Sequence, residues 1–283
     1  NVTWTKTGNI GNLNIEYSTD PTFATDLHTA HPGWPSATLP YPWEVPDFIR
    51  NTVYMRLTSI GGLPVSDSSD NPFTIKGAFT AMSPNGGQIW YKDETNKTIS
   101  WTASGTITNV DIKYKTSTSG SYDGIIVTND PGHTVGSNQY IWPLVPDINS
   151  EECKIKISDN NNLAIPIESA AAFSMRPVIT VSKPVLGADF VVGTSYSNAI
   201  EWSLNGSAKV SNVDVLFSTN GISGPFDKTI ATNVDATLGV SNWSSVPDNL
   251  GGTTVVKVVD KTGGTGNAYV FGLSPVFNII GSI

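Results

Sequence analysis

Three histidines and one cysteine are the side chains of this sequence with the widest chemical repertoire. His28 and His31 lie three residues apart, and a zinc site would need further ligands in a fixed arrangement around them. His133 could form a Ser-His-Asp triad only with a nucleophilic serine, and no serine of the sequence lies in the glycine pattern of a nucleophile elbow. Cys153 shares the parity of the isoleucines in an alternating run, so we interpret it as a small buried hydrophobe. We therefore expect no catalytic residues and no enzyme.

Two oxygen-rich segments are candidates for a cation. Asp67-Ser-Ser-Asp70 and the segment around Asp159 carry the carboxylate and amide oxygens that calcium accepts. Neither follows the spacing of an EF-hand loop, and clusters of Asp, Asn and Ser are ordinary turn chemistry. Calcium stays open as an alternative at Asp67, Asp70 and Asp159, and no other cofactor is expected.

Asn96-Lys-Thr98 and Asn205-Gly-Ser207 are glycosylation sequons, as formally are the segments that begin at Asn1 and Asn242. Asn96 lies in a polar turn and is the most plausible acceptor. Asn96 and Asn205 are candidates only if the source glycosylates asparagine.

The sequence contains eight tryptophans, and one interpretation is carbohydrate binding, because flat aromatic faces stack on sugar rings. Six of them recur at two repeat positions and are more simply structural core, together with a recurring proline: Trp4, Trp101, Trp202, Trp43, Trp142, Trp243, Pro46, Pro146 and Pro247. Trp34 has no counterpart elsewhere. Trp34 lies between prolines in His31-Pro-Gly-Trp34-Pro35, in what we expect to be a variable loop over residues 19–36, so Trp34 and His31 are the candidate ligand or subunit contacts.

The composition excludes several function classes. Charged residues make up 14% of 283 residues, and the net charge is −8. An acidic chain poor in Lys and Arg has little with which to neutralise phosphates, so neither nucleic acid nor an anionic membrane is an expected partner. One cysteine permits no intrachain disulfide. No signal peptide or apolar transmembrane run is present, and the chain opens with Asn1, so we expect a mature product or a segment of something longer.

The sequence repeats with a period of about 100 residues. The landmarks of each repeat are an apolar-x-Trp triplet, an Asn-led alternating segment, a Trp…Val-Pro-Asp element and a final Phe-led strand. The second landmark occurs at Asn12-Leu-Asn-Ile-Glu-Tyr17, Asn109-Val-Asp-Ile-Lys-Tyr114 and Asn212-Val-Asp-Val-Leu-Phe217. Strict alternation predicts half-buried strands, and about seven short strands per repeat predict a sandwich.

We therefore predict an all-β chain of three tandem immunoglobulin-like (fibronectin-III-like) β-sandwiches. The expected boundaries are residues 1–76, 77–176 and 177–280, with 281–283 as the start of a following repeat. The first repeat lacks the segment equivalent to residues 77–97 and hence its first strand. An open sandwich exposes a sheet edge, so we expect upstream sequence or another chain to supply that strand.

One ordered series of short motifs carries a resemblance to known families. It comprises Pro84-x-Gly-Gly-x-x-Trp90, Ile99-Ser-Trp101, Asn109-Val-x-Ile-x-Tyr114, Tyr140-x-Trp-x-x-Val-Pro146 and Ala170…Phe173. The series resembles the Ig-like repeats of prokaryotic cell-surface proteins and is similar to the N-terminal domain of the fungal cell-wall-assembly family of Ser/Thr-rich GPI-anchored proteins. The third repeat departs from it, with Phe190 for Trp90 and Phe217 for Tyr114. The resemblance implies extracellular sandwiches in tandem and no catalytic residues.

These observations favour a non-enzymatic extracellular structural protein, part of a stalk, filament or surface layer at the cell surface. Expected partners are copies of itself or further repeats of a longer chain. The alternatives are an adhesin or carbohydrate-binding array that contacts cell-surface glycans, and an accessory segment of a secreted hydrolase.

Overall fold

The computed structural model describes residues 1–62, 65–161, 164–206, 209–261 and 270–283. Regular structure in these ranges is strand, apart from 3-10 turns at Gly221–Ser223 and Ala236–Leu238. The chain is all-β, as the alternating segments predict. Within the described ranges no helix is long and apolar enough to cross a lipid bilayer.

Residues 1–76 are called unit one, and their described part forms a single sheet. Its strands are β1 (Asn12–Ser18), β2 (His28–Pro35), β3 (Arg50–Ile60), β4 (Ser66–Ser68) and β5 (Phe73–Ile75). The order is β2-β1-β3-β4, and β5 also pairs with β3. On the far side of the core, the chain before β1 makes one isolated bridge, between Val2 and Tyr41.

Residues 77–176, unit two, form two sheets that close around one apolar core. The strands are β6 (Gly77–Ser83), β7 (Ile89–Tyr91), β8 (Thr95–Ser104), β9 (Asn109–Lys115), β10 (Gly124–Pro131), β11 (Gly136–Leu144), β12 (Ser150–Asp159), β13 (Ala164–Ile165), β14 (Ile167–Glu168) and β15 (Phe173–Arg176). One sheet runs β10-β9-β12-β15-β7, with β14 on β12, and the other runs β11-β8-β6-β13.

Residues 177–280, unit three, repeat this two-sheet arrangement. The strands are β16 (Val178–Lys183), β17 (Asp189–Val191), β18 (Tyr196–Asn205), β19 (Asn212–Ser218), β20 (Lys228–Asp235), β21 (Val240–Trp243), β22 (Gly251–Asp260), β23 (Phe271–Leu273) and β24 (Phe277–Ile280). The sheets run β16-β18-β21 and β17-β24-β22-β19-β20, with β23 on β22. The fold is that of immunoglobulin-like sandwiches, as predicted, and we propose the boundaries 76/77 and 176/177 for the units.

Two details differ from the sequence prediction. The expected loop over residues 19–36 contains a full strand, β2, which pairs with β1. Instead of about seven strands, the described residues hold five in unit one (β1–β5), ten in unit two (β6–β15) and nine in unit three (β16–β24). The larger numbers arise because one extended stretch serves both sheets: β6 lies in the four-stranded sheet of unit two and β7 in the six-stranded one.

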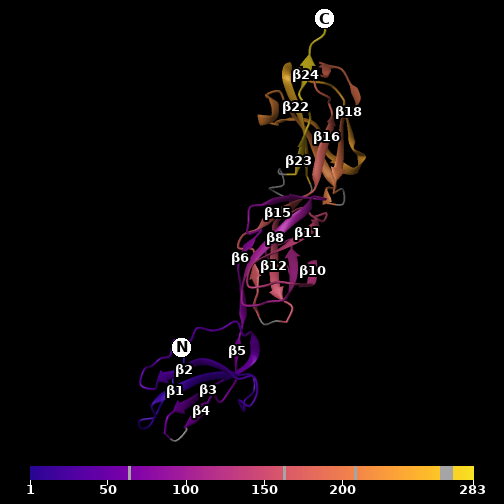
Figure 1. Ribbon diagram of the computed structural model, residues 1–283. Helices are drawn as coiled ribbons and strands as arrows, with labels where there is room; N and C mark the ends of the chain where they lie inside the picture. The colour runs from indigo at the N-terminus through magenta and orange to yellow at the C-terminus, as the bar shows by residue number, and fades with distance from the viewer. Residues whose placement is uncertain (63–64, 162–163, 207–208, 262–269) are drawn as a thin grey trace.

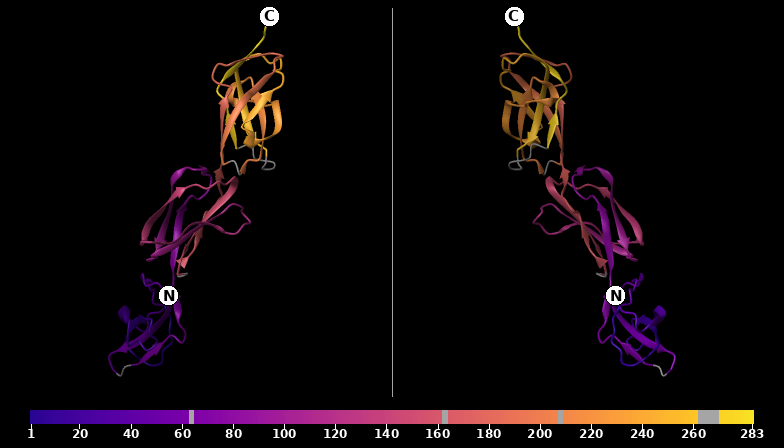
Figure 2. Two further views of the ribbon diagram at one scale, coloured as in Figure 1. Left: turned by 90° about the vertical axis from the view of Figure 1, so that its right-hand side faces the viewer. Right: turned by 90° about the vertical axis from the view of Figure 1, so that its left-hand side faces the viewer.

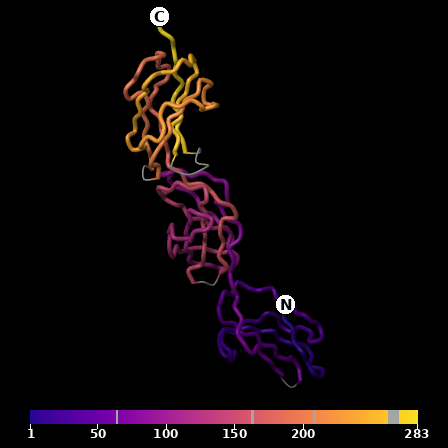
Figure 3. The backbone as a smooth tube through the Cα atoms, turned by 180° about the vertical axis from the view of Figure 1, so that it is seen from behind, coloured from indigo at the N-terminus to yellow at the C-terminus, as the bar shows by residue number. Residues whose placement is uncertain are grey.

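The units follow one another along one long axis, and the C-terminus lies at the far end (Figures 1, 2 and 3). Only Lys76 separates β5 from β6, and only Pro177 separates β15 from β16. The last strand of one unit therefore runs almost directly into the first strand of the next.

Candidate interaction site

The recurring tryptophans of units two and three are buried anchors. Trp101, Trp142, Trp202 and Trp243 are all buried. Trp90 of β7 packs edge-on to Trp142 at 5.9 Å between ring centroids. Phe190 of β17 takes the corresponding place against Trp243, at 5.4 Å.

The matching side chains of unit one are not enclosed in this way. Trp4 and Trp43 are only half-buried. The valine of the Val-Pro-Asp element shows the contrast most clearly, because Val45 is 58% exposed while Val145 and Val246 are 0% and 1% exposed. Trp101, Trp142, Trp202 and Trp243 lie in the core as predicted, whereas the prediction needs correction for Trp4 and Trp43 and for the three prolines. The prolines at 46, 146 and 247 are half-buried in all three units.

The difference between the units has a local cause. In unit two, β6 lays Phe79 and Met82 over the core, and β7 adds Trp90. In unit three, β16 and β17 lay Ile179, Val181 and Phe190 over the matching core. No strand occupies this position among the described residues of unit one.

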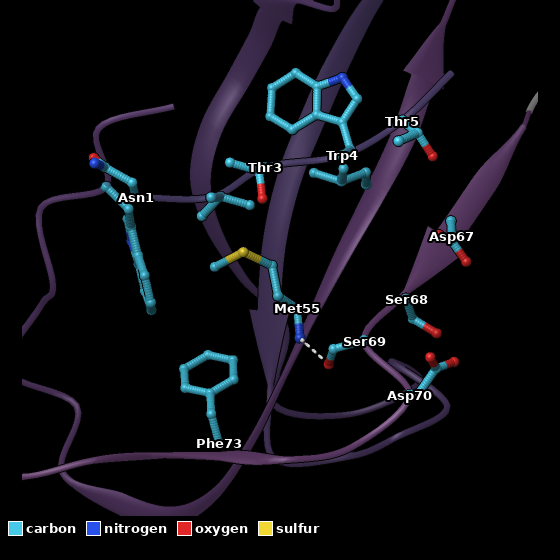
Figure 4. A pocket seen from close by; sticks show the side chains of 13 residues that line it. Asn1, Thr3, Trp4, Thr5, Met55, Asp67, Ser68, Ser69, Asp70 and Phe73 are labelled. Carbon is cyan, nitrogen blue, oxygen red and sulfur yellow. Dashed lines mark hydrogen bonds between the residues drawn. The ribbon is translucent and has the colours of Figure 1, made fainter. Parts of the chain in front are cut away.

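Two adjoining hollows mark the uncovered place, and we call them together the N-terminal groove. The larger, of about 570 Å³, is lined by residues 1–5, Trp43, Met55, Leu57, residues 67–70 and Phe73. The smaller, of about 280 Å³, is lined by residues 4–7, Ile10, Leu13, Leu57 and residues 65–67. Figure 4 shows Met55 and Phe73 at the apolar floor of the larger hollow and Asp67–Asp70 along one side. The floor is thus core surface that the other two units cover.

The carboxylates considered for calcium do not converge. Asp67 lies in β4 and not in a loop, and Asp70 follows it on the rim of the groove. Asp159 is in unit two at the end of β12, where it accepts a hydrogen bond from the Asn161 amide at 3.0 Å. Within the described ranges, no group of three or more His, Cys, Asp or Glu side chains is placed to hold a metal ion.

His31 and Trp34 lie on β2 and pack against their own unit. Their rings meet edge-on at 5.1 Å, and Trp34 meets Tyr41 at 4.9 Å. The Trp34 indole N–H donates to the Thr38 carbonyl at 2.7 Å. The three rings form a small aromatic cluster in which Trp34 stays half-buried.

The two sequon asparagines have different surroundings. Asn96 is exposed on β8 with a positive φ of 57°. Asn205 ends β18 at the junction of units two and three, where its Oδ1 accepts from Lys92 Nζ at 2.8 Å. A glycan on Asn205 would be attached to the Nδ2 that donates to the Lys92 carbonyl, and Ser207 of that sequon lies outside the described residues.

The Val-Pro-Asp element joins units together. Asp47 of this element accepts hydrogen bonds from Thr106 of unit two, at 2.8 Å from the amide and 2.5 Å from the hydroxyl. Ile49 packs beside it on Gly105, so closely that a Cβ there would come within 2.8 Å of Ile49 Cδ1. The recurrence of Asp47 as Asp147 and Asp248 was the signal in the sequence that could have indicated this role.

The junction between units two and three uses the same element. Asp147 lies so close to Gly206 that a Cβ there would come within 2.7 Å of Asp147 Oδ1, and Gly206 has a φ of 105°. Asn149 donates to the Asp260 carboxylate at 2.8 Å and to the Lys209 carbonyl at 3.2 Å. Each junction therefore combines a chain connection of one residue with side-chain contacts from the Val-Pro-Asp element.

No protein-family model matches the chain, and no curated protein matches it in sequence. The resemblance to the fungal cell-wall family is therefore supported by no matching family model or curated protein. Solved structures that are similar to the chain include the tetra-tandem repeat in the extending region of a large adhesion protein, with 15% identity, a TM-score of 0.37, and coverage of 94% of this chain and 66% of that one.

The N-terminal eight Ig domains of Down Syndrome Cell Adhesion Molecule are 11% identical, with a TM-score of 0.35 and coverage of 95% of this chain and 33% of that one. The chicken CNTN1 FN1–FN3 domains are 10% identical, with a TM-score of 0.25 and coverage of 96% of both chains. This chain thus spans less than two thirds of the length of the large adhesion protein structure and of the eight-domain Ig structure.

Proposed function

We propose that this chain is a non-enzymatic structural segment of an extracellular protein, a stiff spacer within a stalk, filament or surface layer. The observation that carries the proposal is the construction of the junctions. Because one residue separates successive units and both sides make direct contacts, the units cannot behave as beads on a flexible string.

The first junction illustrates how bending is resisted. Hinging unit one away from unit two would break both Asp47–Thr106 hydrogen bonds and separate Ile49 from Gly105. Hydrogen bonds to a charged group contribute about 1.5–3 kcal/mol each in protected surroundings and less where water competes. These contacts add up to a preference for one arrangement over a range of bent ones.

The composition suits an extracellular surface in contact with like surfaces. With 14% charged residues, the outer face depends on Ser, Thr and Asn side chains, which form hydrogen bonds without strong charge repulsion. Partners of this chemistry are copies of the chain or further repeats beside it.

The test is small-angle X-ray scattering on the intact chain and on a junction variant, Asp47→Ala with Ile49→Ser. We expect the unmodified chain to scatter as a rod, and the variant to scatter as a broader, more compact ensemble at unchanged molecular mass. The matched control is Asp248→Ala with Leu250→Ser, the same repeat positions at the far end of unit three, where both side chains are exposed. Equal flexibility of the unmodified chain and the junction variant would refute the spacer.

A second candidate function, glycan binding, rests on the aromatic cluster of His31, Trp34 and Tyr41. His31 and Trp34 are half-buried and Tyr41 is buried behind them, so the Trp34 ring offers a partly exposed face on which a sugar could stack. Binding on a glycan array that is lost on Trp34→Ala, with the thermal unfolding of the variant otherwise unchanged, would support this candidate.

A further inference from the structure

In each of the other two units, a strand of that unit occupies the position that corresponds to the N-terminal groove. In unit two, β6 lies antiparallel to β8, with Met82 opposite Trp101 and Phe79 opposite Ala103. In unit three, β16 lies against β18 in the same register, with Val181 opposite Trp202. The tryptophan of the apolar-x-Trp triplet thus marks one fixed position beside the covering strand.

Unit one presents the same tryptophan segment with one side unoccupied. Val2 exchanges two backbone hydrogen bonds with Tyr41, both at 2.9 Å. This pairing corresponds to that of Ile99 in β8 with Tyr140 in β11. The other side of residues 3–7, where β6 would pair, borders the two hollows of the groove. A backbone edge beside an apolar floor is the arrangement that binds an added β-strand.

We propose that the N-terminal groove binds an extended polypeptide segment donated by another Ig-like unit, with the side-chain pattern of residues 77–91. Its first large apolar side chain, equivalent to Phe79, lies opposite Lys6 in the smaller hollow. The next, equivalent to Met82, lies opposite Trp4 over the larger hollow, and an aromatic residue equivalent to Trp90 completes the cover beside Trp43. Because the donor is an Ig-like unit, the inference rests on the proposed function.

The length of the donor follows from the two hollows. Gly281–Ile283 leave β24 as Gly77–Phe79 leave β5, and Ile283 is fully exposed. These three residues correspond only to the segment that fills the smaller hollow. A donor that also covers Met55 and Phe73 must reach as far as the position of Trp90.

The chain contains the sequence of a probe for this site. A synthetic peptide of residues 77–92 is titrated against the intact chain and followed by isothermal titration calorimetry and by hydrogen exchange of residues 2–7. We expect saturable one-to-one binding and slower exchange in that segment. A control peptide with Phe79→Asp and Trp90→Asp is expected to bind at least about tenfold more weakly, because two large apolar side chains lose their burial.

A pair of protein variants localises the binding. Leu57 lines both hollows and is half-buried, so Leu57→Glu places a charge in the floor and should abolish binding. Ile60→Glu changes an exposed residue on the same strand outside the groove and should leave binding unchanged. Circular dichroism of both variants verifies the fold.

Three results would overturn the inference. They are absence of saturable binding, equal affinity for the two peptides, and a concentration-dependent dimer that the peptide does not dissociate, which would assign the groove to a second copy. If the peptide fails to bind while scattering still shows a rod, the strand-binding groove is refuted and the spacer stands. If the chain is flexible in scattering but binds the peptide, the spacer is refuted and the strand-binding groove stands.

Discussion

Truncating the valine of the Val-Pro-Asp element should destabilise unit two strongly and unit one hardly at all. Val145 is 0% exposed and Val45 is 58% exposed, although both precede Pro-Asp after a tryptophan. Val145→Ala therefore removes two methyl groups from a closed core. Val45→Ala removes them from a surface that water already reaches.

The size of the effect follows from burial. Each buried methyl-sized group contributes about 0.8 kcal/mol, and the cavity that is left adds to this, so Val145→Ala should cost unit two about 2–3 kcal/mol of its free energy of unfolding. The backbone hydrogen bonds of Val145 with Glu94 and Asp93 survive the substitution, so packing alone is measured. Val45→Ala should stay within about 0.5 kcal/mol, as exposed substitutions usually do.

Hydrogen exchange read by mass spectrometry suits this comparison, because a chain of several units need not unfold in one step. The slowest amides of β9 and β12 report the opening of unit two. A loss of about 2–3 kcal/mol accelerates their exchange by about 30- to 150-fold. Val246→Ala, at a site 1% exposed, should produce the same acceleration in β19 and β22 and leave unit two unchanged.

One result would refute the reasoning. If Val45→Ala accelerated exchange in β1 and β3 as strongly as Val145→Ala does in unit two, unit one would have a closed core in solution. The groove, and everything inferred from it, would then be wrong.

Two further predictions concern titrating groups. Burial raises the pKa of the Cys153 thiol to about 11. The neutral thiol therefore stabilises the fold fully below its ordinary pKa and less as pH rises through about 11. Cys153→Ala should reduce the alkaline destabilisation of unit two above about pH 9, and maleimide should label Cys153 only after unfolding. Hydrogen bonds from Thr22 and Thr25 hold the pKa of Asp20 well below its usual range. The Asp20 carboxylate therefore stabilises its loop above the ordinary pKa, and this contribution is lost as pH falls toward the lowered one. An NMR titration of Asp20 with an ordinary midpoint would contradict the second prediction.

Much of the fold was predictable because alternation is a local signal. The Asn-led segments became β1, β9 and β19 with their bounds nearly unchanged, and the Phe-led segments became β5, β15 and β24. In β22, Val256 pairs with Phe217 as Ile155 of β12 pairs with Tyr114. The sequence does not indicate this register, because a run of valines carries no alternation to fix it.

The candidate sites were less predictable, because contacts between distant residues leave little trace in one sequence. A loop was expected around Trp34, but pairing with β1 makes it a strand, and pairing depends on a partner elsewhere in the chain. The burial of Trp4 and Trp43 was expected from recurrence alone. Recurrence records the packing of complete units, and the described residues of unit one lack the strand that completes it.

The Val-Pro-Asp element links the two proposals. Its valine reports whether a unit is closed, and its aspartate reports whether the unit is joined to the next one. In unit two, Val145 is buried and Asp147 lies against Gly206 of the following unit. In unit one, Val45 is exposed, although Asp47 accepts a hydrogen bond from Thr106 of the following unit. Unit one is therefore joined at its far end but open at its near end. A strand donated at that open end would bury Val45 and extend the array by the same kind of junction that the chain already contains twice.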